Sequence, residues 1–464
     1  MKQIIKIGSN LISGFIFLVV LIFYSCSITE NYKRPSDITD NKLYRDANVN
    51  DSNNIADIPW NKIFSDTLLQ QLIQEGIDNN LDLKIATSRI KQAQANLRQS
   101  RAAFFPSLEV IASGPIINTE KIVNPSTAYE LYGSAGWEAD IWGKYRSSKR
   151  AALESLLQSD SYKKAVQTQL VSDIAMNYTT LMALDAQLQV TLKTIDNRSL
   201  DVEIMKKLKE SDVVTGAAVV QSEANRYSVE VTIPDLRQNI RITENALSIL
   251  LGRNPGSIAR DSLNNQQVWT GLQTGIPAQL LVNRPDVMQA EYQLRYYYEL
   301  TNVAKSYFFP SLTITAQGGR ANGNISQLIN APILFGNIIA GLTQPVFNHG
   351  LNKQRLKITQ AQREESLLQF KKTILNAGQE VSNALYNYQT ATDKMKIREQ
   401  QIEFLQKSVE YTKELLKYSA NTNYTDVLTS EQSLLAAQLN SVSDKVQQLQ
   451  AVISLYRSLG GGWK

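Results

Sequence analysis

Few side chains in this sequence suit catalysis or metal binding. The chain of 464 residues has one histidine, His349, and one cysteine, Cys26. A zinc site takes several such ligands, and a catalytic triad takes a histidine beside its nucleophile, so neither is easily built here. Paired carboxylates stay open as a source of acid–base chemistry, but no spacing singles out a pair. We therefore predict a protein that is not an enzyme and has no cofactor or metal site, with His349 as surface structure.

The charge pattern argues against a nucleic-acid partner. The net charge is +5, but lysine and arginine alternate with aspartate and glutamate, and no basic block stands out along the chain. Such a pattern is typical of solvated helical surfaces. We predict no binding of nucleic acid.

The single cysteine follows a segment typical of secretion signals. Lys2 and Lys6 precede an apolar run at 11–24, "LISGFIFLVVLIFY", and Ser25 closes it. This order of charged, apolar and small residues predicts a signal peptide over 1–25. A single transmembrane anchor is the alternative, but the run is shorter than the roughly 20 residues that span a bilayer.

A cysteine directly after a small residue resembles the lipobox of bacterial lipoproteins, in which the chain is cleaved before the cysteine and the cysteine is acylated. Here Phe23 stands where leucine is usual, and Ser27 follows the cysteine, which by the same resemblance favours delivery to the outer membrane. A lone thiol in an exported protein is a liability unless it carries lipid. Cys26 is thus the predicted lipidation site.

The pentapeptide "FFPSL" occurs at 104–108 and again at 308–312. Proline after two aromatic residues is unfavourable inside a helix, and residues of alternating polarity follow each copy. We therefore predict that each copy ends a helix and begins a strand. The first of these helices is predicted to start with Ser65 or Asp66 as its N-cap, after a polar stretch over 26–65 that is expected to form an extended, lipid-anchored tail.

Four strands are predicted, and their polar faces carry candidate functional residues. The strands are expected at about 106–114, 130–142, 310–320 and 333–347. Apolar residues alternate with polar ones in the first three, the fourth is a further extended run, and an apolar face opposite a polar face is typical of transmembrane β-strands. A half-buried strand in a soluble sheet is the alternative. The candidates on the polar faces are Glu138, Asp140, Thr313 and Thr315.

A long helix with a heptad repeat follows each strand pair. The first repeat includes Ile174, Leu181 and Val202, and the second includes Phe370, Ile374, Ala377, Val381, Ala384 and Ala391. This period predicts coiled-coil packing, and a helix of about 65 residues would be roughly 100 Å long. The helices are predicted to break at about 211–219 and 419–427.

The order helix, strand, strand, long helix, break, helix therefore occurs twice, over 66–260 and 261–464. Four strands cannot close a membrane barrel, and open edges in lipid leave backbone groups unpaired. If the strands span a membrane, several chains must complete one barrel. Glu138, Asp140, Thr313 and Thr315 are then lumen-facing candidates, and the long helices extend the lumen as a tube.

Two motifs resemble the TolC-type outer membrane factor family. The segment 276–312 is similar to the family's signature around "RRPD" and "FFP", and "CSITENYKRP" at 26–35 resembles the start of its OprM-like (NodT-type) efflux lipoprotein branch. The resemblance covers the chain from Cys26 to about Gly460. It implies a mainly α protein with membrane β structure: a homotrimer whose twelve-stranded outer membrane β-barrel is continuous with a periplasmic α-helical coiled-coil barrel.

The resemblance also implies a function. It predicts a lipid-anchored outer membrane channel that passively exports drugs, detergents or metals in a tripartite efflux system. The implied partners are outer membrane lipid, a periplasmic adaptor (membrane fusion) protein and an inner-membrane RND-type pump. A duct for a type I protein exporter, and a lipid-anchored periplasmic coiled-coil scaffold without a pore, are the alternatives.

The second helix break carries the candidate gate. The family has an acidic "VDVLD" segment there that narrows the closed pore, and this chain has "TDVLT" at 425–429. Asp426 matches the first acid, Thr429 replaces the second, and the first break offers Ala218 at the paired position. Three Asp426 carboxylates near a trimer axis would repel one another and attract cations. The alternative role of Asp426 is to stabilise the N-terminus of the last helix.

Overall fold

The computed structural model describes residues 29–35, 43–45, 53–114, 129–272, 274–322, 326, 328, 334–418 and 424–464. These residues form two compact units, each built from segments that are far apart in sequence. Unit 1 comprises the described residues of Met1–Pro35, Ile90–Ser159 and Ala290–Phe370. Unit 2 comprises those of Ser36–Arg89, Asp160–Gln289 and Lys371–Lys464. Each unit takes segments from both predicted repeats, so the units and the repeats are different divisions of the chain.

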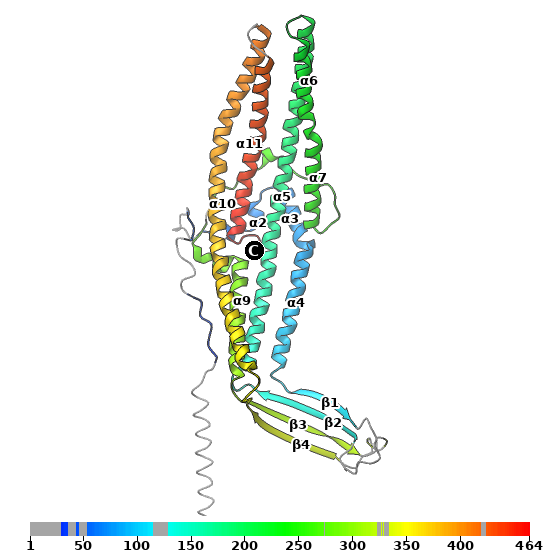
Figure 1. Cartoon of the computed structure of the whole chain (residues 1–464), viewed down its shortest axis with the longest axis vertical. Coiled ribbons are helices and arrows are strands. Elements are labelled where there is room, and N and C mark those ends of the chain that lie inside the picture. The colour runs from blue at the N-terminus through cyan, green and yellow to red at the C-terminus, as the bar shows by residue number, and fades with distance from the viewer. Residues whose placement is uncertain are drawn as a thin grey trace, which may run out of the picture. The chain divides into compact units, whose positions relative to one another are not determined.

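Unit 1 contains one antiparallel sheet with the strand order β1-β2-β3-β4 (Figure 1). Its strands are β1 (Ser107–Ser113), β2 (Tyr129–Ala139), β3 (Ser311–Asn322) and β4 (Leu334–Thr343). Two strands end earlier than the sequence predicts. After β2, Asp140 accepts hydrogen bonds from the next helix, and after β4, Pro345 has no N–H for a strand ladder.

Both copies of "FFPSL" lie where a helix ends and a strand begins, as predicted. Helix α4 (Leu81–Ala102) precedes β1, and helix α9 (Pro285–Ser306) precedes β3. The amide of Phe105 donates to the carbonyl of Ala102 at 2.9 Å, and that of Phe309 donates to Ser306 at 3.2 Å. The same backbone turn is thus built twice, because the proline that follows cannot continue the helix.

The register of the sheet separates an apolar face from a polar one. Glu138 pairs with Thr313, and Thr313 pairs with Gly341, whereas Ile314 lies between Trp137 and Ala340. Since directly opposite residues point to the same side of a sheet, the alternation of all four strands is in phase. The apolar face carries Leu108, Val110, Leu131, Ala135, Trp137, Leu312, Ile314, Ala316, Ile338, Ala340 and Leu342.

Two helices are much longer than the others: α5 (Lys144–Glu210), with 67 residues, and α10 (Leu351–Tyr418), with 68. The remaining helices of more than one turn are α3 (Thr67–Asn79), α6 (Gly216–Glu230), α7 (Thr232–Leu250) and α11 (Tyr424–Ser458), besides α4 and α9. Short turns of helix are η2 (Ile55–Asp57), α2 (Trp60–Ile63), η3 (Leu263–Asn265), η4 (Pro277–Gln279) and α8 (Leu280–Asn283).

The structure divides two helices that the sequence predicts as continuous. Asn80 separates α3 from α4, and its side chain donates to the carbonyl of Leu250 at 2.9 Å and accepts from the amide of Leu83 at 3.1 Å. Val231 separates α6 from α7, near Pro234, whose ring nitrogen cannot donate to the preceding turn. The prediction of Asp66 as an N-cap is confirmed, since its carboxylate accepts from the amides of Leu68 and Leu69.

The heptad residues form the core of unit 2. Ile174, Leu181 and Val202 of α5 are buried, and so are the small and large seam residues of α10: Phe370, which lies at the end of unit 1, and Ile374, Ala377, Val381, Ala384 and Ala391. Alanine at every second position of this seam lets helix backbones approach closely. The predicted coiled-coil seams are therefore the buried sides of both long helices.

The prediction of an extended tail over 26–65 is wrong for the part of the tail in unit 2 that the structure describes. Ile55 and Ala56 are fully buried in η2, and Tyr44 is 4% exposed. The hydroxyl of Tyr456 donates to the carbonyl of Ile58 at 2.7 Å. Polar composition suggested an unpacked segment, but a few isolated apolar side chains are enough to anchor it.

Candidate functional site

Three of the predicted lumen-facing residues lie on the polar face of the sheet in unit 1. Glu138 of β2 is directly opposite Thr313 of β3, and Thr315 follows on the same side of β3. The hydroxyl of Thr313 is 3.4 Å from the carbonyl of Gly341. Side chains on this face are polar or small over much of its length. The structure thus brings Glu138, Thr313 and Thr315 together, and their facing a lumen stays a prediction.

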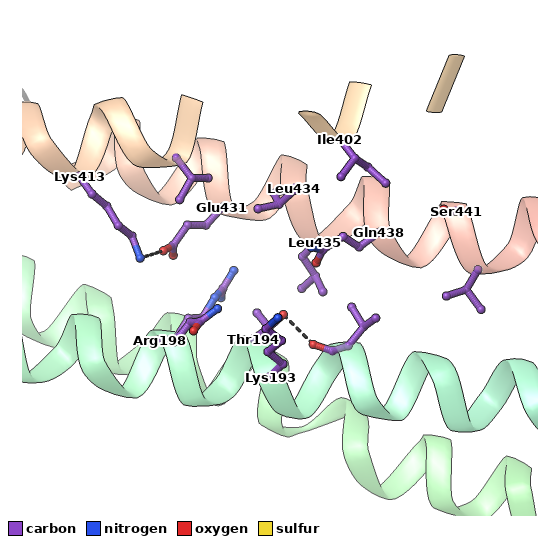
Figure 2. Close-up of a pocket in the computed structure, with 14 residues that line it drawn as sticks. Lys193, Thr194, Arg198, Ile402, Lys413, Glu431, Leu434, Leu435, Gln438 and Ser441 are labelled. Carbon is purple, nitrogen blue, oxygen red and sulfur yellow. Dashed lines mark hydrogen bonds and ion pairs between the residues drawn. The ribbon is translucent and has the colours of Figure 1, made fainter. Parts of the chain in front are cut away.

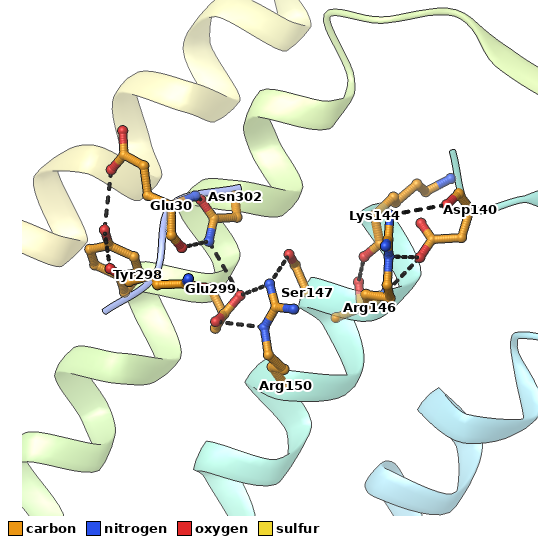
Figure 3. Close-up of polar contacts among 11 residues, drawn as sticks. Glu30, Asp140, Lys144, Arg146, Ser147, Arg150, Tyr298, Glu299 and Asn302 are labelled. Carbon is orange, nitrogen blue, oxygen red and sulfur yellow. Dashed lines mark hydrogen bonds and ion pairs between the residues drawn. The ribbon is translucent and has the colours of Figure 1, made fainter. Parts of the chain in front are cut away.

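The fourth predicted residue, Asp140, lies beyond the end of β2 and stabilises the start of α5. Its carboxylate accepts from the backbone amides of Tyr145 and Arg146 at 2.9 and 3.0 Å, and from the Nε of Arg146 at 3.1 Å. A carboxylate at a helix N-terminus also interacts favourably with the helix dipole. Figure 3 shows Asp140 directed at this first turn.

Glu138 is held by the same helix. Its two carboxylate oxygens accept from the Nζ of Lys144 at 2.9 and 2.8 Å, and one also accepts from the hydroxyl of Tyr145 at 3.0 Å. Burial alone would lower the pKa of Lys144, but the bonds to Glu138 raise it above its ordinary value. The acidic end of β2 is therefore largely neutralised by cations of the helix that follows it.

A chain of polar contacts joins α5, α9 and the segment 29–35 in unit 1 (Figure 3). Arg150 binds both oxygens of the Glu299 carboxylate at 2.8 and 3.0 Å. Asn302 donates to Glu299 at 3.3 Å and to the carbonyl of Glu30 at 3.0 Å. Lys305 binds the Glu30 carboxylate at 2.7 Å.

The same segment is fastened a second time, at the buried carboxylate of Glu291. Arg34 donates to both of its oxygens, at 2.9 and 2.6 Å, and Arg295 donates to one of them at 2.8 Å. Burial alone would raise the pKa of Glu291, but these bonds outweigh it and lower the pKa. The residues that follow the predicted lipidation site are thus fixed to α9, while Cys26 itself lies outside the described residues.

In unit 2, the ends of four helices meet in an apolar cluster close to both helix breaks. Met205 of α5, Val219 of α6, Leu416 of α10, and Tyr424 and Val427 of α11 are buried against one another. Leu208 and Val214 pack at its edge. The break between α5 and α6 lies within the predicted range 211–219, whereas 419–423 lie outside the described residues.

The candidate gate residue lies next to this cluster. Asp426 is exposed in the first turn of α11, and Ala218, at the paired position of the first break, is half-buried in α6. An acid in the first turn suits the positive end of a helix dipole. This position suits the helix-stabilising role considered for Asp426, and its gating role stays a prediction.

An ion triad with two buried carboxylates links three helices near the cluster. Lys413 of α10 contacts Asp201 of α5 at 2.8 Å and Glu431 of α11 at 2.6 Å. Burial and the neighbouring Asp201 raise the pKa of Glu431 to about 7. At neutral pH, one lysine thus lies beside two carboxyl groups, of which one is partly protonated. Since α5 belongs to the first break and α10 and α11 to the second, this triad connects the two breaks.

The triad borders a cavity of about 340 Å³ between α5, α10 and α11 (Figure 2). Apolar, uncharged polar and charged side chains line it; among them are Thr194, Arg198, Leu434, Leu435 and Gln438. Arg198 is 4% exposed and donates to the carbonyl of Asn225 at 2.6 Å.

Two properties of the described residues relate to the predictions about metal binding and membrane crossing. The described residues contain no cluster of three or more histidine, cysteine, aspartate or glutamate side chains with the geometry of a metal site. In the same part of the chain, no helix combines the length and apolar character that crossing a bilayer requires. His349 lies in the turn before α10 with a positive φ of 54°, and its ring contacts Phe347.

Comparison with known proteins identifies the family. The family described as outer membrane efflux protein matches residues 72–253 and 276–461. This chain belongs to that family. The two matched ranges together cover most of the chain, and they contain all four strands and both long helices.

Curated relatives of this outer membrane efflux protein align along nearly its whole length. The cation efflux system protein CusC of Escherichia coli O157:H7 is 28% identical over 97% of this chain and 98% of the relative. The probable efflux pump outer membrane protein TtgC of Pseudomonas putida is 26% identical over 88% of this chain and 86% of the relative. The probable outer membrane lipoprotein SilC of Salmonella typhimurium is 25% identical over 96% and 97%.

Solved structures of efflux channels have the same fold. A crystal structure of CusC is similar with a TM-score of 0.82 and 27% identity, over 94% of this chain and all of that one. The outer-membrane channel OprN is similar with a TM-score of 0.85 at 21% identity, over the same shares. The protein is accordingly an outer membrane efflux channel component with a mainly helical fold and few strands.

Sequence reasoning missed the ion pairs of this outer membrane efflux protein. Glu431 and Asp201 stand beside the apolar seams in sequence, and acidic residues at such positions are a signal of buried pairing. Their partner Lys413 is 212 residues from Asp201, and no local pattern predicts that contact. Lys144 and Arg146 were visible as cations directly after a strand that ends in acids, which is a stronger signal.

Proposed function

We propose that three copies of this chain form a passive duct across the outer membrane. Each copy would supply four strands to a twelve-stranded barrel, with the polar faces of the strands, including Glu138, Thr313 and Thr315, toward a wet lumen. The long helices α5 and α10 would continue the duct as a periplasmic coiled-coil barrel. In this proposal the chain has no catalytic activity of its own, in keeping with a family of channels.

The observation that carries this proposal is the sheet of unit 1. All four strands place apolar side chains on one face, and Leu108, Val110, Ile338 and Leu342 are between 68% and 82% exposed. Among the described residues, β1 and β4 each have a strand neighbour on one side only. A sheet with a bare apolar face and two open edges is explained if lipid covers the face and further copies pair with the edges.

The proposed partners follow from the relatives. CusC is named as part of a cation efflux system and TtgC as part of an efflux pump. We propose that this chain likewise receives its substrate from an inner-membrane RND-type pump through a periplasmic adaptor. The substrate class is left as small molecules, namely drugs, detergents or metals, because the relatives of cation and of drug or solvent pumps are about equally similar to the chain. Acylation of Cys26 and a signal peptide over 1–25 belong to the same proposal.

The gate proposal assigns Asp426 to a ring near the trimer axis. Three carboxylates there would favour cations and repel anions in the closed channel. The test is the single-channel conductance and ion selectivity of Asp426→Ala and Asp426→Asn beside the wild type. We expect both variants to lose cation preference. Equal cation conductance and selectivity in all three proteins would leave Asp426 only its helix-stabilising role.

The duct itself is tested by planar-bilayer conductance of the purified protein, with the oligomer size measured on the same sample. Trimers that form cation-preferring channels are the expected result. A monomer that never conducts would favour the periplasmic scaffold without a pore. Trimers that conduct but are required for secretion of a protein, and not for resistance to small toxic molecules, would favour the duct of a type I exporter.

A further inference from the structure

Positive charge is concentrated where the helices of unit 1 meet the sheet. The fifteen residues that adjoin each strand at its helical end are 92–106, 140–154, 296–310 and 344–358. These four stretches contain ten lysines and arginines and only three acids. Their excess of seven positive charges is larger than the net charge of +5 of the whole chain, so the rest of the protein is net acidic.

The three acids in these stretches point away from solvent. Asp140 and Glu299 are paired with Arg146 and Arg150, and their side chains are only 11% and 10% exposed. Glu154 is half-buried, and burial raises its pKa. The acids therefore do little to offset the positive charge that reaches the surface.

Half of the ten cations, by contrast, are both exposed and without an ion pair among the described residues. Five of them are exposed and form no ion pair with any carboxylate in the described part of the chain: Arg98, Arg101, Lys149, Lys353 and Lys357. We call these five residues the basic collar. Leaving so many like charges close together costs free energy unless an anionic surface is near.

The register of the sheet brings the residues of the collar to one end of the strands. Ser107 pairs with Gly136, Leu312 with Ala139, and Ser311 with Thr343, so the helical ends of all four strands are level. Figure 1 shows the four strand–helix junctions at the same end of the sheet. The cations of α4, α5 and α10 thus lie beyond the same end of the strands.

Exposed apolar residues lie directly beside the collar. Phe105 is 74% exposed, Val346 99% and Phe347 79%, and each is within a few residues of a strand end. An apolar band bordered by aromatic residues and then by cations matches the order of layers in a lipid leaflet: acyl chains, interface and headgroups.

We propose that the basic collar binds the anionic headgroups of phospholipids in the leaflet next to the strand–helix junctions. This inference rests on the proposed function, because it takes the sheet to lie in a bilayer. It goes beyond that function by assigning a lipid class to a surface that conduction does not need. The collar would fix the depth of the sheet in the membrane and select phosphatidylglycerol-like or cardiolipin-like lipids over zwitterionic ones.

The experiment uses the full chain reconstituted in phosphatidylcholine vesicles that contain a trace of dansyl-labelled phosphatidylglycerol or dansyl-labelled phosphatidylcholine. Energy transfer from tryptophan to dansyl reports which lipid lies beside the protein, because Trp137 and Trp142 are near the junctions. One cation near an anionic surface changes affinity about fivefold, so we expect the wild type to prefer the anionic lipid by about that factor. Raising the salt concentration should weaken the preference.

The collar variant is Arg98→Gln, Arg101→Gln, Lys149→Gln and Lys353→Gln together. The matched control is Arg237→Gln, Arg241→Gln, Lys372→Gln and Lys396→Gln, which removes two arginines and two lysines that are equally exposed in unit 2. We expect the preference to fall close to unity in the collar variant and to persist in the control. Both variants should keep the conductance of the wild type, which also shows that they fold.

The outcomes separate this inference from the proposed function. A wild type that inserts and conducts in phosphatidylcholine but shows no lipid preference overturns the collar proposal alone, and so does a collar variant that keeps the preference. A chain that inserts into no vesicle overturns both. If the preference is unchanged while the collar variant loses cross-linking to an acidic periplasmic protein, the collar serves a protein partner and the lipid proposal is wrong.

Discussion

The two "FFPSL" junctions have the same backbone turn but different surroundings. At the first, Phe105 is 74% exposed, and the indole of Trp137 donates to the carbonyl of Phe104 at 2.9 Å. At the second, Phe309 packs on Trp142 with ring centroids 5.0 Å apart, and the Trp142 indole donates to the carbonyl of Pro310 at 2.7 Å. Each turn is thus closed by one tryptophan, but that tryptophan stacks on a phenylalanine of the turn only at the second junction. At the first, Phe104 packs on Tyr145 instead, with ring centroids 6.1 Å apart.

The difference follows from position in the sheet. The first junction leads into β1, which is an edge strand in the described sheet, and the second leads into β3, which has neighbours on both sides. Helix α9 also forms ion pairs with Arg150 of α5 and with the segment 29–35, whereas α4, which is described in full, forms none of this kind. A pentapeptide determines the local turn, and its neighbours determine how much that turn contributes to stability.

The largest expected effect contrasts the two tryptophans. Trp142→Ala removes an aromatic contact and a hydrogen bond in a packed junction, and we expect a loss of about 3–4 kcal/mol in unfolding free energy. Trp137→Ala removes one hydrogen bond at an exposed position and should cost about 1 kcal/mol. Denaturant titration of both variants in detergent measures the two losses of unfolding free energy. Equal losses would mean that both junctions are packed alike in the assembled protein.

The next effect concerns the ion pair between Arg150 of α5 and Glu299 of α9, the helix that leads to the second junction. Glu299→Ala leaves Arg150 half-buried without its carboxylate, and breaking such a pair should cost about 3 kcal/mol at most, since Arg150 is 39% exposed. Glu109→Ala, at an exposed acid of β1, is the matched control and should cost less than about 0.5 kcal/mol. A loss for Glu299→Ala as small as for the control would show that water replaces the pair.

A smaller effect is expected at the helix starts. Asp140→Ala removes the carboxylate that accepts from two amides of α5 and should cost about 1 kcal/mol. Asp140→Asn keeps an acceptor but not the charge, and we expect it to retain about half of that contribution. Thermal melting of both variants at low and high salt separates the contribution of the hydrogen bonds from that of the charge. Only the contribution of the charge should weaken with salt. Identical losses in the two variants would assign the whole effect to charge.

The smallest effect is the pH response of the segment that binds α9. The folded state lowers the pKa of Glu291 below its ordinary value of 4.5. Its carboxylate therefore contributes stability above pH 4.5, and that contribution is lost as the pH falls through the lower, folded value. Limited proteolysis near 29–35 should become faster under acid in the wild type. In Glu291→Gln it should already be fast at neutral pH; a wild type that resists cleavage at all pH values contradicts the expectation.

The sequence predicted the elements better than their contacts. "FFPSL" and the alternation around Trp137 placed helix ends and strands because these signals are local. The heptads placed the buried sides of α5 and α10 for the same reason. The break at Asn80 was missed because an asparagine in a helical pattern becomes a break only when partners such as the Leu250 carbonyl are near.

The candidate site was predicted less completely. Glu138, Thr313 and Thr315 do share one face, since strand periodicity fixes it. The pairing of Asp140 with the amides of α5, and the triad of Asp201, Lys413 and Glu431, depend on contacts between separate elements. Sequence patterns of single elements contain no information about those distances.

The open edges of β1 and β4 have a consequence for biogenesis. If further copies pair with these edges as proposed, each newly exported chain carries, until then, two rows of free backbone donors and acceptors next to a bare apolar face in the described sheet, which is the arrangement that templates aggregation. The chain is therefore most prone to aggregate in the interval between its export and the pairing of these edges. Production that outpaces assembly should yield insoluble protein, and periplasmic holding factors that cover strand edges should raise the yield of channels more than any change that stabilises the finished fold.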